Sequence, residues 1–180
     1  MLTITIPESE QYDSKNNRFY YIKEQTIKLE HSLLSISKWE QKWEKPFLSK
    51  NEKTFEELID YIRCMTITQN VDPIVYYTIP SDVMDQIVEY IDKKMTATWF
   101  SDDKNSIPSR EIITSEIIYY WMFTYNIPLE MQKIHLNRLM TLIRVCSEKN
   151  APSKKMKKND IYSRNRALNE ARKKALNTRG

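Results

Sequence analysis

The stretch TFEELIDYIRCM, residues 54–65, decides the fold. Thr54 and Glu57 have the spacing of a capping box, in which each side chain accepts a hydrogen bond from the other residue's backbone amide. Apolar residues then recur at the three- and four-residue spacing of a helix: Phe55, Leu58, Ile59, Ile62 and Met65. The stretch therefore predicts an amphipathic helix of about three turns whose apolar side faces a core.

Two neighbouring segments show the same periodicity. Ser32 is placed to cap a helix that Pro46 stops, and the inner face of this helix comprises Leu33, Ile36, Trp39 or Glu40, and Trp43. Ser81 and Asp82 open a further helix, with Met84, Ile87, Val88 and Ile91 directed inward. The first half of the chain therefore contains three predicted helices.

The longest apolar segment comes later, in residues 110–126. It starts amphipathic and becomes apolar nearly all round, which predicts a central, buried helix. Pro128 is placed at the first position of the next helix, which runs to about Cys146, with Leu136, Leu139, Met140 and Ile143 inward. A connection of two or three residues predicts that these two helices form an antiparallel pair. Before them, residues 95–100 fit either a strand or a short helix, and residues 102–109 form a polar loop.

The N-terminal residues have a different pattern. Leu2–Ile6 alternates apolar and polar residues, residues 19–22 and 26–29 are similarly rich in β-forming residues, and residues 13–17 form a polar turn. The sequence thus predicts an α+β, mainly α, fold, in which a small antiparallel β-hairpin or meander precedes a helical bundle and a basic C-terminal helix. The predicted domains are residues 1–30, 31–147 and 148–180.

The composition changes abruptly after Cys146. Residues 147–180 contain 11 Lys or Arg against three Asp or Glu, a formal charge of +8, which leaves −4 for residues 1–146 of a chain whose net charge is +4. Residues 151–158 are interpreted as a basic linker and residues 160–176 as a helix with a thin apolar stripe, made of Ile161, Leu168, Ala171 and Ala175. We expect this tail either to dock on a partner or to remain mobile.

The chain contains a single glycine, Gly180. Phosphate-binding loops and nucleophile elbows need glycine, because only a residue without Cβ freely adopts positive φ or lets the backbone approach a ligand closely. The sequence therefore excludes a P-loop, a dinucleotide-binding fingerprint and a nucleophile elbow. We expect no enzymatic activity and no cofactor.

The candidate metal and nucleophile residues are few. His31 and His135 belong to no HExxH pair, and Cys64 and Cys146 belong to no CxxC pair. We interpret the histidines as hydrogen-bonded structural residues and the cysteines as buried free thiols of a reducing compartment. The longest uncharged apolar run, residues 117–123, is far shorter than the ~20 residues of a membrane span, so we expect no membrane association.

Two acidic features remain. Residues 102–104 bring Asp, Asp and Lys together, but in a polar loop that we interpret as solvated rather than catalytic. Glu116 lies in the most apolar predicted helix, where a buried carboxylate needs a partner. We expect it to pair with Arg138 or Arg144.

Two groups of residues are candidates for binding a partner protein. Trp39, Trp43 and Phe47 cluster at one helix end, where core packing is the commoner outcome and a docking patch the alternative. In the tail the candidates are the apolar stripe and its cations: Ile161, Arg164, Arg166, Leu168, Arg172, Lys173 and Lys174. Tyr162 is the only aromatic residue of the tail, which weakens the case for single-stranded nucleic acid. We favour a protein partner over nucleic acid here, and a solvated tail is the third alternative.

Seven segments resemble one known family. They are residues 28–40 (KLEHSLLSISKWE), 42–48 (KWEKPFL), 95–100 (MTATWF), 110–116 (REIITSE), 135–139 (HLNRL), 163–167 (SRNRA) and 176–180 (LNTRG). The likeness is to the tail assembly chaperones of long-tailed bacteriophages and extends over most of the chain. It implies a non-catalytic protein that binds the tape measure protein, keeps it soluble and helps to recruit tail-tube subunits.

The resemblance also implies a location and leaves alternatives. Such chaperones act in the cytoplasm of the host bacterium and are generally absent from the finished virion. One alternative is a structural component of the virion, such as a head–tail connector or a tail-tip subunit. Another, less favoured, is a nucleic-acid-binding phage factor.

Overall fold

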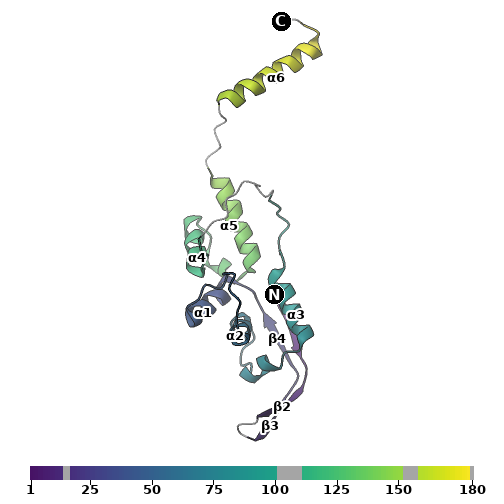
Figure 1. Cartoon of the computed structure of the whole chain (residues 1–180), viewed down its shortest axis with the longest axis vertical. Helices are drawn as coiled ribbons and strands as arrows, with labels where there is room; N and C mark the ends of the chain where they lie inside the picture. The colour runs from purple at the N-terminus through teal and green to yellow at the C-terminus, as the bar shows by residue number, and fades with distance from the viewer. Residues whose placement is uncertain (14–16, 101–110, 152–157, 179–180) are drawn as a thin grey trace. The chain divides into compact units, whose positions relative to one another are not determined.

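The computed structural model describes residues 1–13, 17–100, 111–151 and 158–178. Its chain divides into two compact units, Met1–Ser147 and Glu148–Gly180. The first unit combines a small antiparallel β-structure with helices, and the second contains one long helix (Figure 1). The predicted α+β, mainly α, fold class is confirmed.

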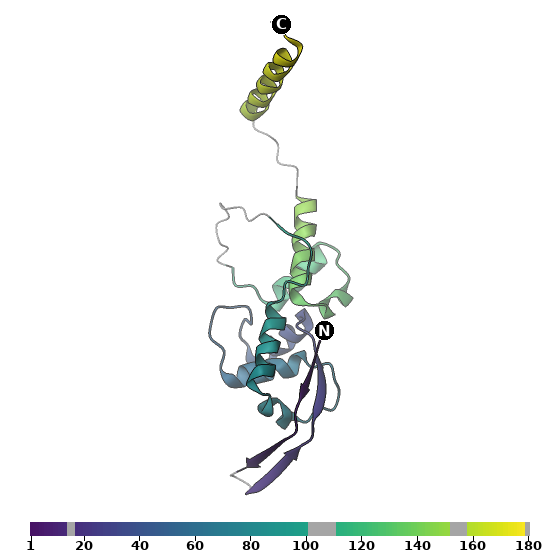
Figure 2. The same ribbon diagram turned by 90° about the vertical axis from the view of Figure 1, so that its right-hand side faces the viewer.

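The β-structure is a ribbon of two nested antiparallel pairs, formed by β1 (Leu2–Ile6), β2 (Ser9–Asp13), β3 (Arg18–Ile22) and β4 (Gln25–Leu29). The pair β2–β3, with Ser9 opposite Ile22, lies inside the pair β1–β4, with Leu2 opposite Leu29. Strand β2 was not predicted, because its sequence SEQYD is polar. Residues 14–16 of the predicted turn lie outside the described residues. In two views the β2–β3 hairpin extends beyond the helices of its unit (Figures 1 and 2).

The first two helices follow the prediction closely. Helix α1 (Leu33–Trp43) is capped by Ser32, and α2 (Phe55–Met65) begins with the reciprocal Thr54–Glu57 capping box. The two helices pack against each other, and the indole Nε1 of Trp39 donates to the Glu57 carbonyl oxygen at 2.8 Å. Phe55 and Leu58 are exposed rather than inward.

A buried carboxylate joins α1 to the helix α4 (Ser115–Thr124). Glu40 is only 8% exposed and accepts hydrogen bonds from the backbone amides of Phe47, at 2.8 Å, and Ser115, at 2.7 Å. The second contact satisfies a donor at the N-terminus of α4, where the helix dipole also favours negative charge. Glu40 therefore defines where α4 begins.

The predicted α4 differs from the observed helix in length and burial. The helix starts at Ser115, and residues 111–114 are irregular. Only one side is buried, by Ser115, Ile118 and Met122, whereas Tyr120 and Phe123 are each 66% exposed. Its closest backbone contacts are with α1 rather than with α5 (Leu136–Asn150). The expected central, buried helix is wrong, because Glu116, Tyr120 and Phe123 are exposed. The expected connection of two or three residues to the next helix is also wrong, because α5 begins only at Leu136.

The segment after α4 also differs from the prediction. Instead of one helix from Pro128, the chain forms a 3-10 helix, η2 (Leu129–Lys133), and only then α5. The break occurs because Ile134 is extended and His135 forms a β-bridge with Ser32. The amide of Leu136, which opens α5, donates to the His31 carbonyl oxygen at 2.8 Å.

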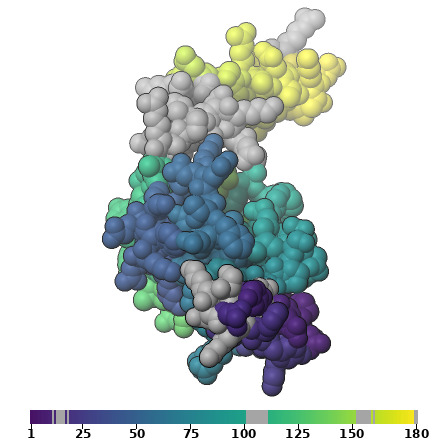
Figure 3. All heavy atoms as spheres, turned by 60° about the horizontal axis from the view of Figure 1, so that its bottom comes forward, coloured from purple at the N-terminus to yellow at the C-terminus, as the bar shows by residue number. Residues whose placement is uncertain are grey.

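The helix α3 (Ser81–Asp92) follows a 3-10 helix, η1 (Pro73–Thr78), and packs against β1. It buries Val83, Ile87 and Tyr90, while Val88 is 51% exposed instead of inward as predicted. Residues 95–100 form no regular element, so both structures considered for them are wrong. In the space-filling view, the purple N-terminal strands lie at the edge of the blue and teal surface of the helices (Figure 3).

The C-terminal unit contains α6 (Lys158–Leu176). Every side chain of α6 that the structure describes is exposed. The helix ends at Asn177, whose φ of 49° is left-handed, and the Thr178 amide donates to the Lys173 carbonyl oxygen at 3.1 Å, as in a C-terminal cap. Among the described residues, no helix is long and apolar enough to cross a membrane.

Candidate functional site

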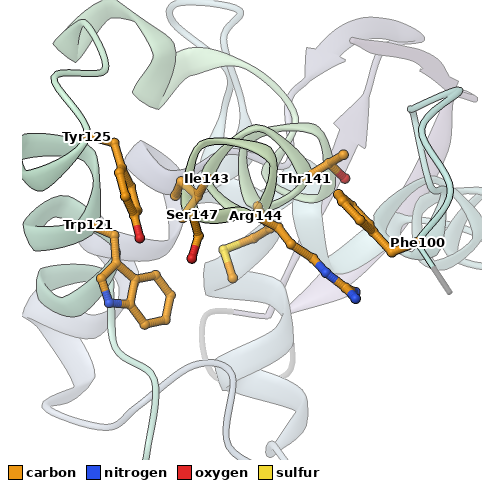
Figure 4. A pocket seen from close by; sticks show the side chains of 8 residues that line it. Phe100, Trp121, Tyr125, Thr141, Ile143, Arg144 and Ser147 are labelled. Atoms are coloured by element: carbon orange, nitrogen blue, oxygen red, sulfur yellow. The ribbon is translucent and has the colours of Figure 1, made fainter. Parts of the chain in front are cut away.

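An apolar groove lies beside α5 in the first unit. It has a volume of about 460 Å³, and we call it the α5 groove. Its lining residues are Phe100, Trp121, Tyr125, Met140, Thr141, Ile143, Arg144 and Ser147. Figure 4 shows α5 nearly end-on, with Trp121 and Tyr125 on one side and Phe100 on the other. The groove therefore receives side chains from α4, from α5 and from the irregular segment before residue 101.

The α5 groove is chemically one-sided. Among the described residues that line it there is no acid, and the one cation is Arg144, whose guanidinium carbon lies 4.0 Å from the centre of the Phe100 ring. An arginine over an aromatic face is stabilised by the ring quadrupole. A ligand with apolar groups would be complementary to this surface.

Further aromatic residues are exposed on the elements that form the groove. On α4, Tyr120 and Phe123 are largely exposed. Tyr120 precedes the groove residue Trp121 in sequence, whereas Phe123 lies about 200° from Trp121 around the helix. Trp99, which precedes Phe100, is 76% exposed, with the Lys94 ammonium 4.2 Å from its ring centre. Large exposed aromatic residues are enriched at protein interfaces. This end of the first unit therefore has the composition of a binding surface.

A second aromatic surface lies on the β2–β3 hairpin. Tyr12, Phe19 and Tyr21 are each more than half exposed, and the rings of Tyr12 and Phe19 lie 4.9 Å apart. The Tyr12 hydroxyl donates to the Asn17 side chain and the Tyr21 hydroxyl donates to Glu8. The hydrogen bond to Glu8 raises the pKa of Tyr21. We call this surface the hairpin face.

Trp39 and Phe47 are part of the core, which is the commoner of the two outcomes expected for them. Trp39 is 1% exposed, and Phe47 packs with its ring centre 4.0 Å from that of Tyr61. Trp43 is half-buried and donates from its indole Nε1 to Asp60 at 3.0 Å. Trp39 and Phe47 are therefore wrong as partner-binding candidates, because neither is accessible in the folded chain.

The tail candidates are accessible. Ile161, Arg164, Arg166, Leu168, Arg172, Lys173 and Lys174 all belong to α6 and all are exposed. Arg166 pairs with Glu170, one helical turn further on, at 3.4 Å. These residues form one basic helical surface whose ligand the sequence left open between protein and nucleic acid.

The two histidines meet in the core, which the sequence did not predict. Their rings lie 5.1 Å apart, His31 Nδ1 lies 2.5 Å from the Tyr61 hydroxyl, and His135 Nε2 lies 3.0 Å from the Tyr90 carbonyl oxygen. Burial, together with the neighbouring His135, lowers the pKa of His31 to about 4. Burial also lowers the pKa of His135. Both residues are hydrogen-bonded structural histidines, as expected, and both are neutral at pH 7.

The remaining candidate residues for metal binding, nucleophilic attack or acid–base chemistry form no catalytic arrangement among the described residues. Among the described residues, no group of three or more His, Cys, Asp or Glu could hold a metal ion. Cys64 and Cys146 are half-buried free thiols, and burial raises the pKa of Cys64 to about 11. Glu116 is exposed in the first turn of α4, where the hydrogen bond to its own backbone amide, and then that to Thr114, lower its pKa.

The expectation of a buried Glu116 paired with arginine is therefore wrong, because the side of α4 that carries it faces solvent. Where the structure describes burial, the buried acids are Glu40, Glu57 and Asp60. Residues 102–104 lie outside the described residues.

Sequence reasoning missed the α5 groove because Phe100 and α5 are far apart in the chain. The only hint in the sequence was that α4 is apolar on all sides. We interpreted this as a sign of a buried helix, but several of its aromatic side chains are exposed. Comparisons of the chain with protein-family models, with curated proteins and with solved structures find no match.

Proposed function

We propose that this chain is a non-catalytic assembly chaperone or adaptor that holds an amphipathic helical segment of a larger protein. The α5 groove carries the proposal, because it is open and apolar and is lined by the aromatic side chains of Phe100, Trp121 and Tyr125. The resemblance of seven sequence segments to the tail assembly chaperones of long-tailed phages supports the tape measure protein as the client. Tail-tube subunits would be recruited afterwards.

The size of the α5 groove suits a helix face rather than a whole domain. A volume of about 460 Å³ accommodates a few large apolar side chains, such as those that recur every three or four residues in a helix laid in a groove. Burial of apolar surface contributes about 25 cal/mol per Å², and loss of motional freedom offsets much of it. Such a contact is reversible, as a chaperone requires.

Co-expression with a tape measure protein tests the proposal. We expect the chain to raise the soluble yield of the client and to co-purify with it. Met140→Glu places a charge in the α5 groove and should abolish both effects. Ile67→Glu, at an exposed apolar residue outside the groove, is the matched control and should abolish neither. Unchanged co-purification with M140E, at an unchanged melting temperature, would rule out the groove as the client site.

The proposal also assigns a place of action. A chaperone acts in the host cytoplasm and leaves before the tail is complete, whereas a connector or tail-tip subunit remains in the particle. Quantitative mass spectrometry of purified virions distinguishes the two. We expect the chain to be present in infected-cell lysate and absent from particles, and stoichiometric retention would favour the structural alternative.

A further inference from the structure

The cations of α6 surround the helix. Successive residues of a helix are about 100° apart, so the consecutive Arg172, Lys173 and Lys174 point in three directions. By the same geometry, Arg164 and Arg166 point to nearly opposite sides. All five side chains are exposed. The positive charge is therefore spread around the whole circumference of α6.

This distribution does not suit docking on a protein surface. A helix that docks on a protein buries one apolar face and keeps its charges on the other. The predicted apolar stripe of α6 contains two large residues, Ile161 and Leu168, and Arg172 lies four residues beyond Leu168 on the same side of the helix. A protein groove would have to desolvate that arginine along with the leucine.

A helix in the major groove of DNA has a different environment. The groove of B-form DNA is about 12 Å wide and admits a helix of 10–12 Å diameter, with phosphates along both walls. Cations on opposite sides of such a helix then all find phosphate partners. We propose that α6 binds duplex DNA in the major groove, chiefly through its phosphates.

One side of α6 adds groups that suit base edges. Asn165 and Asn169 are four residues apart and therefore lie on the same side. With Tyr162 and the ion pair of Arg166 and Glu170 they line a shallow hollow on the helix. Amide side chains donate and accept hydrogen bonds, which is what the edge of an adenine offers. Most of the affinity nevertheless comes from phosphate neutralisation, so binding tolerates many sequences.

The geometry favours DNA over the other nucleic acids. The major groove of A-form RNA is deep and narrow and does not admit side chains readily. Binding of single strands relies on stacking aromatic residues, and Tyr162 is the only one in the tail. DNA binding by α6 is independent of the α5 groove and of the client proposed for it.

Fluorescence anisotropy with the full chain and a labelled 20-bp DNA duplex tests the proposal. We expect the logarithm of the association constant to fall linearly with the logarithm of salt concentration between 50 and 200 mM NaCl. The triple variant Arg164→Gln, Arg172→Gln and Lys174→Gln removes three phosphate contacts. It should weaken binding at least tenfold at the lower salt and reduce the slope by about 2–3.

The matched control removes the same charge from the first unit, through Lys23→Gln, Lys50→Gln and Lys93→Gln, all at exposed lysines. We expect it to bind DNA within about twofold of the unaltered chain. A second pair of variants distinguishes the role of the helix from the role of its charge. Leu168→Pro breaks α6 without altering its charge, whereas Leu168→Ala preserves the helix. The proline variant should bind at least tenfold more weakly than the alanine variant.

Three results would overturn the proposal. Equal loss in both triple variants would mean that only net charge matters. Equal binding to polyglutamate of the same charge would indicate an acidic protein as the ligand. Equal binding to a 20-bp RNA duplex or to a single strand would exclude major-groove recognition of DNA.

Discussion

The two units of this chain use the same kinds of charged residue in opposite ways. In Met1–Ser147, lysines complete the fold, since Lys42 pairs with the largely buried Asp60 at 2.5 Å and Lys45 pairs with Glu57 at 2.6 Å. In Glu148–Gly180 the ion pair Arg166–Glu170 is exposed at both ends, and exposed pairs contribute at most about 1 kcal/mol. Charged side chains therefore complete the fold of the first unit, whereas those described in the second unit remain in solvent.

The largest expected difference between the two units comes from truncating one large apolar side chain in each of them. Trp39→Ala removes a side chain that is 1% exposed, together with its hydrogen bond to Glu57, and should destabilise the fold by about 3–5 kcal/mol. Leu168→Ala, at an exposed residue of α6, should change the unfolding free energy by less than about 0.5 kcal/mol. Urea unfolding followed by far-UV circular dichroism measures both, and similar losses would contradict the contrast.

The buried histidines give the first unit a dependence on pH that the tail cannot have. The pKa of His31 is lowered from 6.5 to about 4, so the folded state favours the neutral ring. Its contribution is complete above pH 6.5 and is lost as the pH falls toward 4, by about 3 kcal/mol in total.

Urea midpoints of the unaltered chain should therefore decrease between pH 7 and pH 4.5, and His31→Asn should flatten this profile. The carboxylate of Glu57 does not confuse the test, because Lys45 and then Thr54 lower its pKa below the ordinary 4.5 and its loss comes in more acidic solution. A profile that H31N leaves unaltered would exclude His31 as the origin.

A smaller effect comes from the carboxylate between α1 and α4. Glu40→Ala leaves the amides of Phe47 and Ser115 without their acceptor, which should cost about 2–3 kcal/mol. Glu130→Ala removes an exposed acid and should stay within about 0.5 kcal/mol. Chemical denaturation compares the two, and equal effects would mean that water replaces Glu40 without loss.

The smallest expected effect on stability comes from altering a charged residue of the second unit. Glu170→Gln breaks the exposed pair with Arg166 and removes a negative charge from α6. The unfolding free energy of the first unit should not change by more than about 0.3 kcal/mol, while DNA affinity should increase about two- to threefold at low salt. Calorimetry and anisotropy on the same samples provide both values, and an unfolding change without an affinity change would reverse our interpretation.

Local signals predicted α1 and α2 well, because the caps at Ser32 and Thr54 act within one turn of each helix. The predictions were wrong where contacts between residues far apart in the sequence determine the ends of an element. The start of α4 depends on Glu40, and the break before α5 depends on the bridge between His135 and Ser32. Strand β2 is polar and forms only because β3 pairs with it.

The candidate site was harder to predict than the fold. The tail candidates could be named from composition, since their exposure follows from a weak apolar stripe. The α5 groove could not, because Phe100 reaches it from an irregular segment. For Trp39 and Phe47 core packing was the commoner expectation and a docking patch the alternative, because periodicity identifies a helix face but not what covers that face.

The positions of the four tryptophans make intrinsic fluorescence a useful probe of this chain. Trp39 is buried, Trp43 is half-buried, Trp121 lines the α5 groove and Trp99 is exposed, whereas residues 148–180 contain none. Emission excited at long wavelength therefore reports client binding and unfolding in the first unit. Because α6 has no tryptophan, the intrinsic emission comes from the first unit alone.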